Sequence, residues 1–206
     1  MKRSALLLVA LAMGLSLGCG ASVVKLSHDE FDRLPRDSRQ EIFDAENDLV
    51  IARNRHDEAE DRKQATERAL DDLSERWKRT DKRLNASGQG GRSSQARKVF
   101  DANKTYLKAQ LDVTKAAIDT SELEIALSRA RLVLVRQRQA ARIGRATLGS
   151  LKPLEEKVAD VDAKVKASNR DQTGPRTEAQ KQLDAWKNAE DEYARATNDY
   201  DTGVWE

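Results

Sequence analysis

Few residues of this chain belong to the types that carry out chemistry at specific sites. Its 206 residues include one Cys, Cys19, and two His, His28 and His56. One thiol cannot form an internal disulfide, and one thiol with two imidazoles falls short of the four ligands of a usual zinc site. Acidic pairs such as Asp71-Asp72 could act in acid–base catalysis, but on charged helices such pairs are ordinarily solvated. No glycine-rich phosphate loop, serine nucleophile elbow or His-Glu-x-x-His motif occurs. We therefore expect no enzymatic activity, no metal, no cofactor and no small-molecule substrate.

The first eighteen residues have the order of segments that is typical of a secretory signal peptide. Lys2 and Arg3 precede an almost wholly apolar stretch from Ala5 to Leu17, which the small residue Gly18 follows. Such a stretch is too short to cross a bilayer as a mature helix. We predict that residues 1–18 are a signal peptide that is removed from the mature protein.

The junction Leu15-Ser16-Leu17-Gly18-Cys19 resembles the lipobox of bacterial lipoproteins, in which a small residue precedes the modified cysteine. Ser16 departs from the family pattern, because leucine is commonest at that position. The resemblance implies that Cys19 is diacylated on its sulfur, that the bond after Gly18 is cut, and that the new amine is acylated. The alternative is a plain secretory signal with a cysteine near the cut. The position of the single Cys favours lipidation.

Lipidation would determine where the protein resides. Each buried methylene contributes roughly 0.8 kcal/mol, so two or three acyl chains hold a protein at a membrane almost permanently. No later run of about 18 apolar residues occurs, and we expect the mature protein to be anchored in the membrane and not to span it. The resemblance also implies transfer to the outer membrane, because Gly20 and not Asp follows Cys19. The expected location is the bacterial cell envelope, at the outer membrane and facing the periplasm.

The remainder of the chain has the composition of a helical protein. It is 35% charged, and 10 Gly and 3 Pro are too few for the turns of a strand-rich sandwich. Residues 19–36 show little periodicity and are predicted to form a lipidated tether. From Ile42 to Leu84, seam positions recur alternately three and four residues apart, which is the spacing of a coiled coil. This spacing predicts a helix over 37–86, ended by the glycine-rich segment 87–91.

A second helix is predicted from a cap at Ser93-Ser94 to about Leu148, and its seam has the same spacing. In both helices large seam residues alternate with small ones such as Ala52 and Ala59. In a parallel pair, large seam residues would face large ones, and the layers of small residues between them would leave voids. In an antiparallel pair, each large seam residue faces a small one. The two helices should therefore form an antiparallel hairpin.

Two registers of this hairpin fit the pattern. In one, residue numbers that sum to 184 lie opposite each other, and Trp77 faces Leu107. In the other the numbers sum to 177, and Trp77 faces Phe100. In both registers the polar seam residues His56 and Lys63 meet polar seam residues of the second helix, as in coiled coils that fix register at a cost in stability. We interpret His56 as a polar layer of the seam; the alternative is a proton sensor.

The last third of the chain is predicted to supply a third helical leg. A second apolar edge between Leu123 and Ala141 needs another neighbour. Residues 151–165 carry apolar residues three and four apart, the segment 168–175 interrupts the pattern, and a final helix begins near Arg176. The fold class is therefore all-α: an elongated antiparallel coiled-coil hairpin with a third, interrupted leg, a rod similar to a three-helix bundle over residues 37–201, followed by a tail over 202–206.

Charge is dense but balanced. The chain has 37 Lys and Arg against 35 Asp and Glu, and without Lys2 and Arg3 the two counts are equal. Basic and acidic residues alternate without an aromatic platform, so nucleic acid is not an expected partner. The most one-sided segment, which we call the arginine stripe, is the candidate face for another envelope protein or for lipid headgroups. It consists of Arg129, Arg131, Arg136, Arg138 and Arg142. The alternative is that these arginines pair with Glu and Asp of the neighbouring legs.

Two binding functions follow from these expectations. The first is a structural or adaptor lipoprotein that is anchored through its N-terminal lipid and binds other envelope components along its helices. The second is a holdase-like periplasmic chaperone for unfolded or outer-membrane clients, by loose analogy with chaperones that have coiled-coil arms. Homo-oligomerisation is compatible with both.

Overall fold

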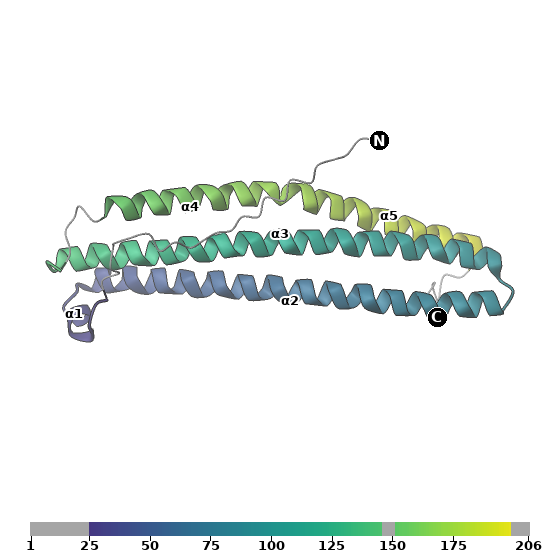
Figure 1. Ribbon diagram of the computed structural model, residues 1–206, viewed down its shortest axis with the longest axis horizontal. Coiled ribbons are helices and arrows are strands. Elements are labelled where there is room, and N and C mark those ends of the chain that lie inside the picture. The colour runs from purple at the N-terminus through teal and green to yellow at the C-terminus, as the bar shows by residue number, and fades with distance from the viewer. Residues whose placement is uncertain (1–24, 146–150, 199–206) are drawn as a thin grey trace, which may run out of the picture.

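The computed structural model describes residues 25–145 and 151–198, and helices account for almost all of them (Figure 1). The helices are α1 (His28–Asp32), α2 (Arg36–Ala86), α3 (Gly90–Arg142), α4 (Lys152–Asp171) and α5 (Thr173–Thr197). No strand occurs in these two ranges. The all-α prediction, with a long hairpin and an interrupted third leg, is confirmed.

Helices α2 and α3 form the antiparallel hairpin. They contain 51 and 53 residues, so each is about 75–80 Å long at 1.5 Å per residue. The turn between them depends on Gly88, whose φ of +72° is in the left-handed region that favours glycine. Its N–H donates to the carbonyl of Asn85, and the Gln89 N–H donates to that of Leu84, the Schellman pattern that ends a helix.

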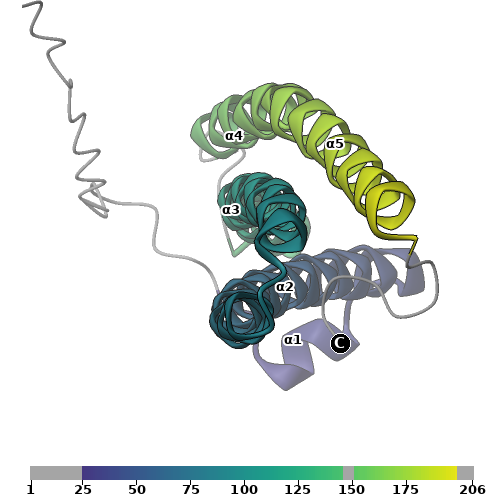
Figure 2. The same ribbon diagram turned by 90° about the vertical axis from the view of Figure 1, so that its right-hand side faces the viewer.

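Helix α3 is the central leg of the rod. It packs against α2 on one side and against α4 and α5 on the other. Figure 2 shows this arrangement along the rod: α4 and α5 arch over α3, and α2 lies beyond it. The second apolar edge of α3 lies in the contact with the third leg, and its members Leu127, Ala130 and Leu134 are buried. The predicted need for a second neighbour is therefore met by the third leg.

The hairpin has the register in which residue numbers sum to 177. Trp77 of α2 stacks on Phe100 of α3, with ring centroids 5.1 Å apart. Farther along, His56 Nδ1 lies 3.1 Å from Ser121 Oγ. The polar seam residue His56 thus meets a polar residue, as predicted for either register. The small seam residues Ala52 and Ala59 are buried, as large-on-small packing requires.

An apolar cluster lies near the hairpin turn, where α2, α3 and α5 meet. It joins buried side chains of all three helices: Leu73, Trp77, Leu84, Ala96, Val99, Phe100 and Tyr193. Trp186 of α5 packs against this cluster and stacks on Tyr106, with ring centroids 5.4 Å apart. The third leg is thus fixed to the hairpin by aromatic side chains at this end.

The bounds of α3 differ from the prediction at both ends. The helix begins at Gly90, so Ser93 lies within its first turn and does not cap it. The Ser93 hydroxyl donates instead to Asp81 of α2, at 3.1 Å. It ends at Arg142 and not near Leu148. Gly144, with φ of +75°, closes a second Schellman turn, in which the Arg145 N–H donates to the Ala140 carbonyl.

The interruption of the third leg is narrower than the predicted segment 168–175. Only Gln172 separates α4 from α5, and its own backbone conformation is helical. Pro175 has no N–H to donate to the residue four positions earlier, which breaks the ladder of hydrogen bonds at this point. The two helices therefore continue one another with a bend.

The segment predicted to be a tether contains the short helix α1. Ser27 and Glu30 form a capping box, in which the Ser27 hydroxyl accepts from the Glu30 N–H and the Glu30 carboxylate accepts from the Ser27 N–H. The pattern Ser-x-x-Glu is visible in the sequence and could have revealed this helix. The predicted tail, 202–206, lies outside the described residues.

Candidate functional site

The two residues of the predicted lipidation site, Gly18 and Cys19, lie outside the described residues. The described chain begins at Lys25. From there to Asp32 it crosses the end of the rod at which α2 begins and α3 ends, and this end is therefore the part of the described structure nearest in sequence to Cys19.

An ionic contact fastens α1 to the end of the rod. The carboxylate of Glu30, besides closing the capping box, pairs with the guanidinium of Arg145, just beyond α3. The pKa of Glu30 is lowered, mainly because its carboxylate accepts from the backbone N–H of Ser27. Desolvation opposes this effect, and the Ser27 hydroxyl and Arg145 lower the pKa further. The ionised form of Glu30 thus stabilises the cap of α1 first and its docking on Arg145 to a smaller extent.

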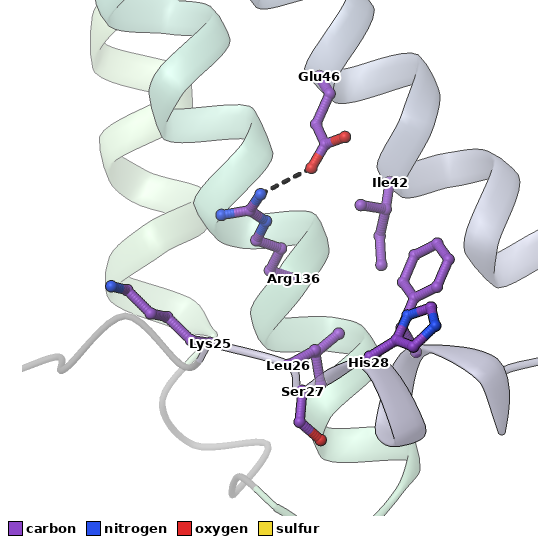
Figure 3. Close-up of a pocket in the computed structure, with 8 residues that line it drawn as sticks. Lys25, Leu26, Ser27, His28, Ile42, Glu46 and Arg136 are labelled. Atoms are coloured by element: carbon purple, nitrogen blue, oxygen red, sulfur yellow. Dashed lines mark hydrogen bonds and ion pairs between the residues drawn. The ribbon is translucent and has the colours of Figure 1, made fainter.

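A cavity of about 370 Å³ lies between the segment before α1 and the two long helices (Figure 3). Its apolar lining comes from Leu26, Phe31 and Ile42. Its charged lining includes Arg136, which donates to Glu46 at 2.7 Å and so closes an ion pair between α3 and α2. The lining thus combines apolar side chains with the Arg136–Glu46 ion pair and with a second cation, Lys25.

Most of the arginine stripe connects the legs of the rod. Arg131 and Arg138 reach α4, where they donate to Asp162 at 3.1 Å and to Glu155 at 2.9 Å. Arg136 reaches Glu46 of α2. Three members therefore form the ion pairs with neighbouring legs that we considered as the alternative to a partner face.

The other two members of the stripe differ from these three. Arg142 donates to the Ser38 hydroxyl of α2 at 2.7 Å and to Gln139 at 3.2 Å. The side chain of Arg129 is exposed and makes no hydrogen bond or ion pair within the described residues. The stripe therefore does not form one continuous unpaired cationic face, and Arg129 is the member that is available to an anionic partner.

The two histidines lie far apart and have different surroundings. His28 is exposed at the rod end, and its Nε2 is 3.6 Å from Asp32. His56 lies in the α2–α3 seam, where it contacts Ser121 and, at 3.7 Å, Glu60. No group of three or more His, Cys, Asp or Glu side chains in the described part of the chain is arranged to hold a metal ion.

A buried polar network at the bend between α4 and α5 was not predicted from the sequence. Gln172 is 6% exposed, and its amide donates to Thr120 Oγ1 at 2.6 Å. The Thr120 hydroxyl lies 2.6 Å from that of Ser168, and Arg176 donates to Gln172 Oε1 at 2.6 Å. The network ties the bend to α3. The sequence around Gln172 gives no apolar signal for burial, and only the packing of the third leg reveals it.

The chain matches no family model, no curated protein and no solved structure. Within residues 25–145 and 151–198, no helix combines the length and apolar character that crossing a membrane requires.

Proposed function

We propose that this protein is a lipid-anchored lipoprotein of the bacterial cell envelope that acts as a structural or adaptor rod. The observation that carries the proposal is the junction Leu15-Ser16-Leu17-Gly18-Cys19, which ends an apolar stretch and contains the only cysteine of the chain. The acyl chains on Cys19 hold the protein at the outer membrane, and the rod extends on the periplasmic side.

The form of the described helices supports a function in binding. The core runs along the seams between the legs, so most of the surface is the charged exterior of long helices. Such a surface offers extended faces for other envelope components. The exposed Arg129 and the end of the rod near Lys25 are two places where a partner can make contact.

The anchor is tested by replacing Cys19 with Ala in the full chain. The expected result is loss of palmitate labelling and accumulation of an unprocessed or soluble species. Ser16→Leu is the matched control, because it brings the lipobox closer to the family pattern and should be labelled and processed at least as well as the wild type. Continued labelling and membrane fractionation of Cys19→Ala would refute the anchor. Density-gradient separation of the two membranes then tests the outer-membrane location.

The adaptor role is tested by cross-linking in intact cells, followed by identification of the attached proteins. Recovery of a defined envelope assembly is expected. Arg129→Glu should reduce this recovery if the partner is anionic, and it should leave the fold intact because the Arg129 side chain is exposed and makes no hydrogen bond or ion pair within the described residues.

A holdase is the second candidate, and the observation that favours it is a small group of exposed apolar side chains on α2: Phe43, Val50 and Ile51. A holdase should suppress aggregation of unfolded outer-membrane proteins at near-stoichiometric amounts. An adaptor should not do so, and light scattering during dilution of an unfolded client separates the two functions.

A further inference from the structure

The exposed large apolar side chains of the described residues all lie on one short stretch of α2. They are Phe43, Val50 and Ile51, which are 52%, 49% and 44% exposed. Phe31 of α1 covers one edge of Phe43, with ring centroids 5.4 Å apart. Scattered single exposed apolar residues are common on protein surfaces, but a cluster within about two helical turns indicates a contact surface.

Phe43 and Val50 belong to a second seam on the outer side of α2, and Ile51 lies beside it. The positions of this seam, which we call the outer stripe, recur alternately four and three residues apart, and every one is exposed. The stripe consists of Arg36, Gln40, Phe43, Asn47, Val50, Asn54, Asp57 and Asp61. Ile42, Ala45 and Ala52 on the opposite side of the helix are buried in the hairpin. Because α4 and α5 pack on α3, they leave the outer stripe uncovered, and only α1 lies beside its first turns, where Phe31 contacts Phe43 (Figure 1).

Charge is ordered along the outer stripe. It begins with the basic Arg36 and ends with the acidic Asp57 and Asp61. The five positions between them, from Gln40 to Asn54, carry no charge, although 35% of the whole chain is charged. The side chains of Arg36, Asp57 and Asp61 form no hydrogen bond or ion pair within the described residues. The two ends of the stripe therefore have complementary charges that the fold itself leaves unused.

We propose that the outer stripe is the interface with a second copy of this chain, packed antiparallel about a two-fold axis near Asn47 and Val50. A stripe that runs from a basic end through uncharged residues to an acidic end is complementary to itself when reversed, which is the requirement of an isologous two-fold contact. If residue numbers that sum to 97 lie opposite each other, Arg36 meets Asp61 of the second copy and Asn47 meets Val50. Asparagine at seam positions fixes register in coiled coils at some cost in stability.

The same order of charges disfavours a parallel second copy and a membrane surface as partners of the outer stripe. A parallel pair would place Arg36 against Arg36, and Asp57 and Asp61 against their own copies, and like charges at such positions repel. An interfacial membrane helix carries mainly Lys and Arg beside its apolar face, whereas one end of this stripe is acidic and would be repelled by anionic headgroups. In the antiparallel pair, the contact covers only about 26 residues of α2, and the two hairpin turns point in opposite directions.

Cysteine cross-linking of the full chain in membranes tests this arrangement. Asn47→Cys and Val50→Cys each place a thiol near the proposed axis, and Ala65→Cys places one on the same side of α2 beyond the acidic end. With a short bis-maleimide, we expect a dimer from Asn47→Cys and from Val50→Cys, and none from Ala65→Cys or from the wild type, which controls for Cys19. Equal cross-linking at Ala65 would indicate a parallel or non-specific contact, and no cross-linking at any position would mean that something other than a second copy covers the stripe. Either result would overturn the proposal.

Charge exchange provides a second test of the same interface. Arg36→Asp or Asp61→Arg alone replaces an attractive pair by a repulsive one at two symmetric places, and should lower the dimer yield of Val50→Cys about two- to tenfold. The two substitutions together restore the pairs in reverse and should recover the yield. Unchanged yields for the single variants, or no recovery in the double variant, would contradict the antiparallel pairing. All of these positions are exposed, so unaltered helical circular dichroism is the check that the rod remains folded.

Discussion

The indole of Trp77 on α2 stacks on the ring of Phe100 on α3, with centroids 5.1 Å apart and 24° between the planes. The guanidinium of Arg97 lies 5.3 Å from the centroid of each ring. Both rings belong to the apolar cluster near the hairpin turn. This contact exists in only one of the two registers that the seam allows, so it identifies the pairing of the two helices.

A double-mutant cycle between Trp77 and Phe100 tests the register. We expect Trp77→Leu and Phe100→Leu to be non-additive, with a coupling free energy of about 0.5–1.5 kcal/mol, because stacked rings contribute beyond the area they bury. Urea unfolding followed by circular dichroism measures each variant. Trp77→Leu combined with Leu132→Ala, a distant buried site on α3, should be additive. Additivity of the Trp77 and Phe100 changes would place the two rings apart and refute this register.

The buried alanines of α2 should not tolerate larger side chains. Ala52 and Ala59 are 3% and 5% exposed. Replacing either by Leu inserts three carbon atoms into a packed seam and should lower the free energy of unfolding by about 1–3 kcal/mol. Ala65→Leu is the matched control, because Ala65 is exposed on the same helix, and its effect should lie within about 0.5 kcal/mol. An unchanged urea midpoint for Ala52→Leu would mean that this side of α2 is not in the hairpin contact.

The polar network at the bend should stabilise the third leg. Gln172→Ala removes the amide that joins Thr120 to Arg176 and leaves their polar atoms with fewer partners. Thr120 keeps its contacts with Ser168 and the Ala116 carbonyl, and Arg176 is exposed to water, so the loss is that of a net hydrogen bond and the free energy of unfolding should fall by about 0.5–1.5 kcal/mol. Thr177→Ala, which loses only an exposed hydrogen bond within α5, should have little effect. Amide hydrogen exchange around residues 168–176 should increase in Gln172→Ala, and equal exchange in the two variants would show that the network adds nothing.

The docking of α1 should weaken in acid. The lowered pKa of Glu30 means that its ionised form is favoured in the folded state over the unfolded chain, where the ordinary value is 4.5. Its contribution is therefore fully present above about pH 4.5 and is lost as the pH falls through the lower folded-state pKa. Amide exchange of residues 28–32 as a function of pH follows this loss. Glu30→Gln should remove most of the dependence in this range, whereas Asp29→Asn, in the same turn, should keep it. If Glu30→Gln behaved as the wild type, the carboxylate would not be what holds α1.

The periodic part of the chain allowed the helices to be predicted from sequence. The seam from Ile42 to Leu84, and the glycine-containing segment after Ala86, gave the extent of α2 to within two residues. The alternation of large and small seam residues gave the antiparallel direction. These features are local, because a helix and its turn depend on residues a few positions apart. The capping box of Ser27 and Glu30 is also local, and α1 was predictable in the same way.

The tertiary structure decided what depends on distant residues. The two registers differ by one heptad, and each stacks large seam residues on small ones, so the sequence pattern alone does not separate their packing energies. The arginine stripe could meet a partner or the neighbouring legs, and Glu46, Glu155 and Asp162 of those legs pair with three of its members. Gln172 is polar and lies near a proline, so only the packing of α4 and α5 on α3 reveals its burial. The sequence by itself determined the helices, their direction and the candidate anchor at Cys19, because these depend on local spacing. Register, ion pairing and the uncovered outer stripe of α2 were decided by the fold, because they depend on which distant side chains come into contact.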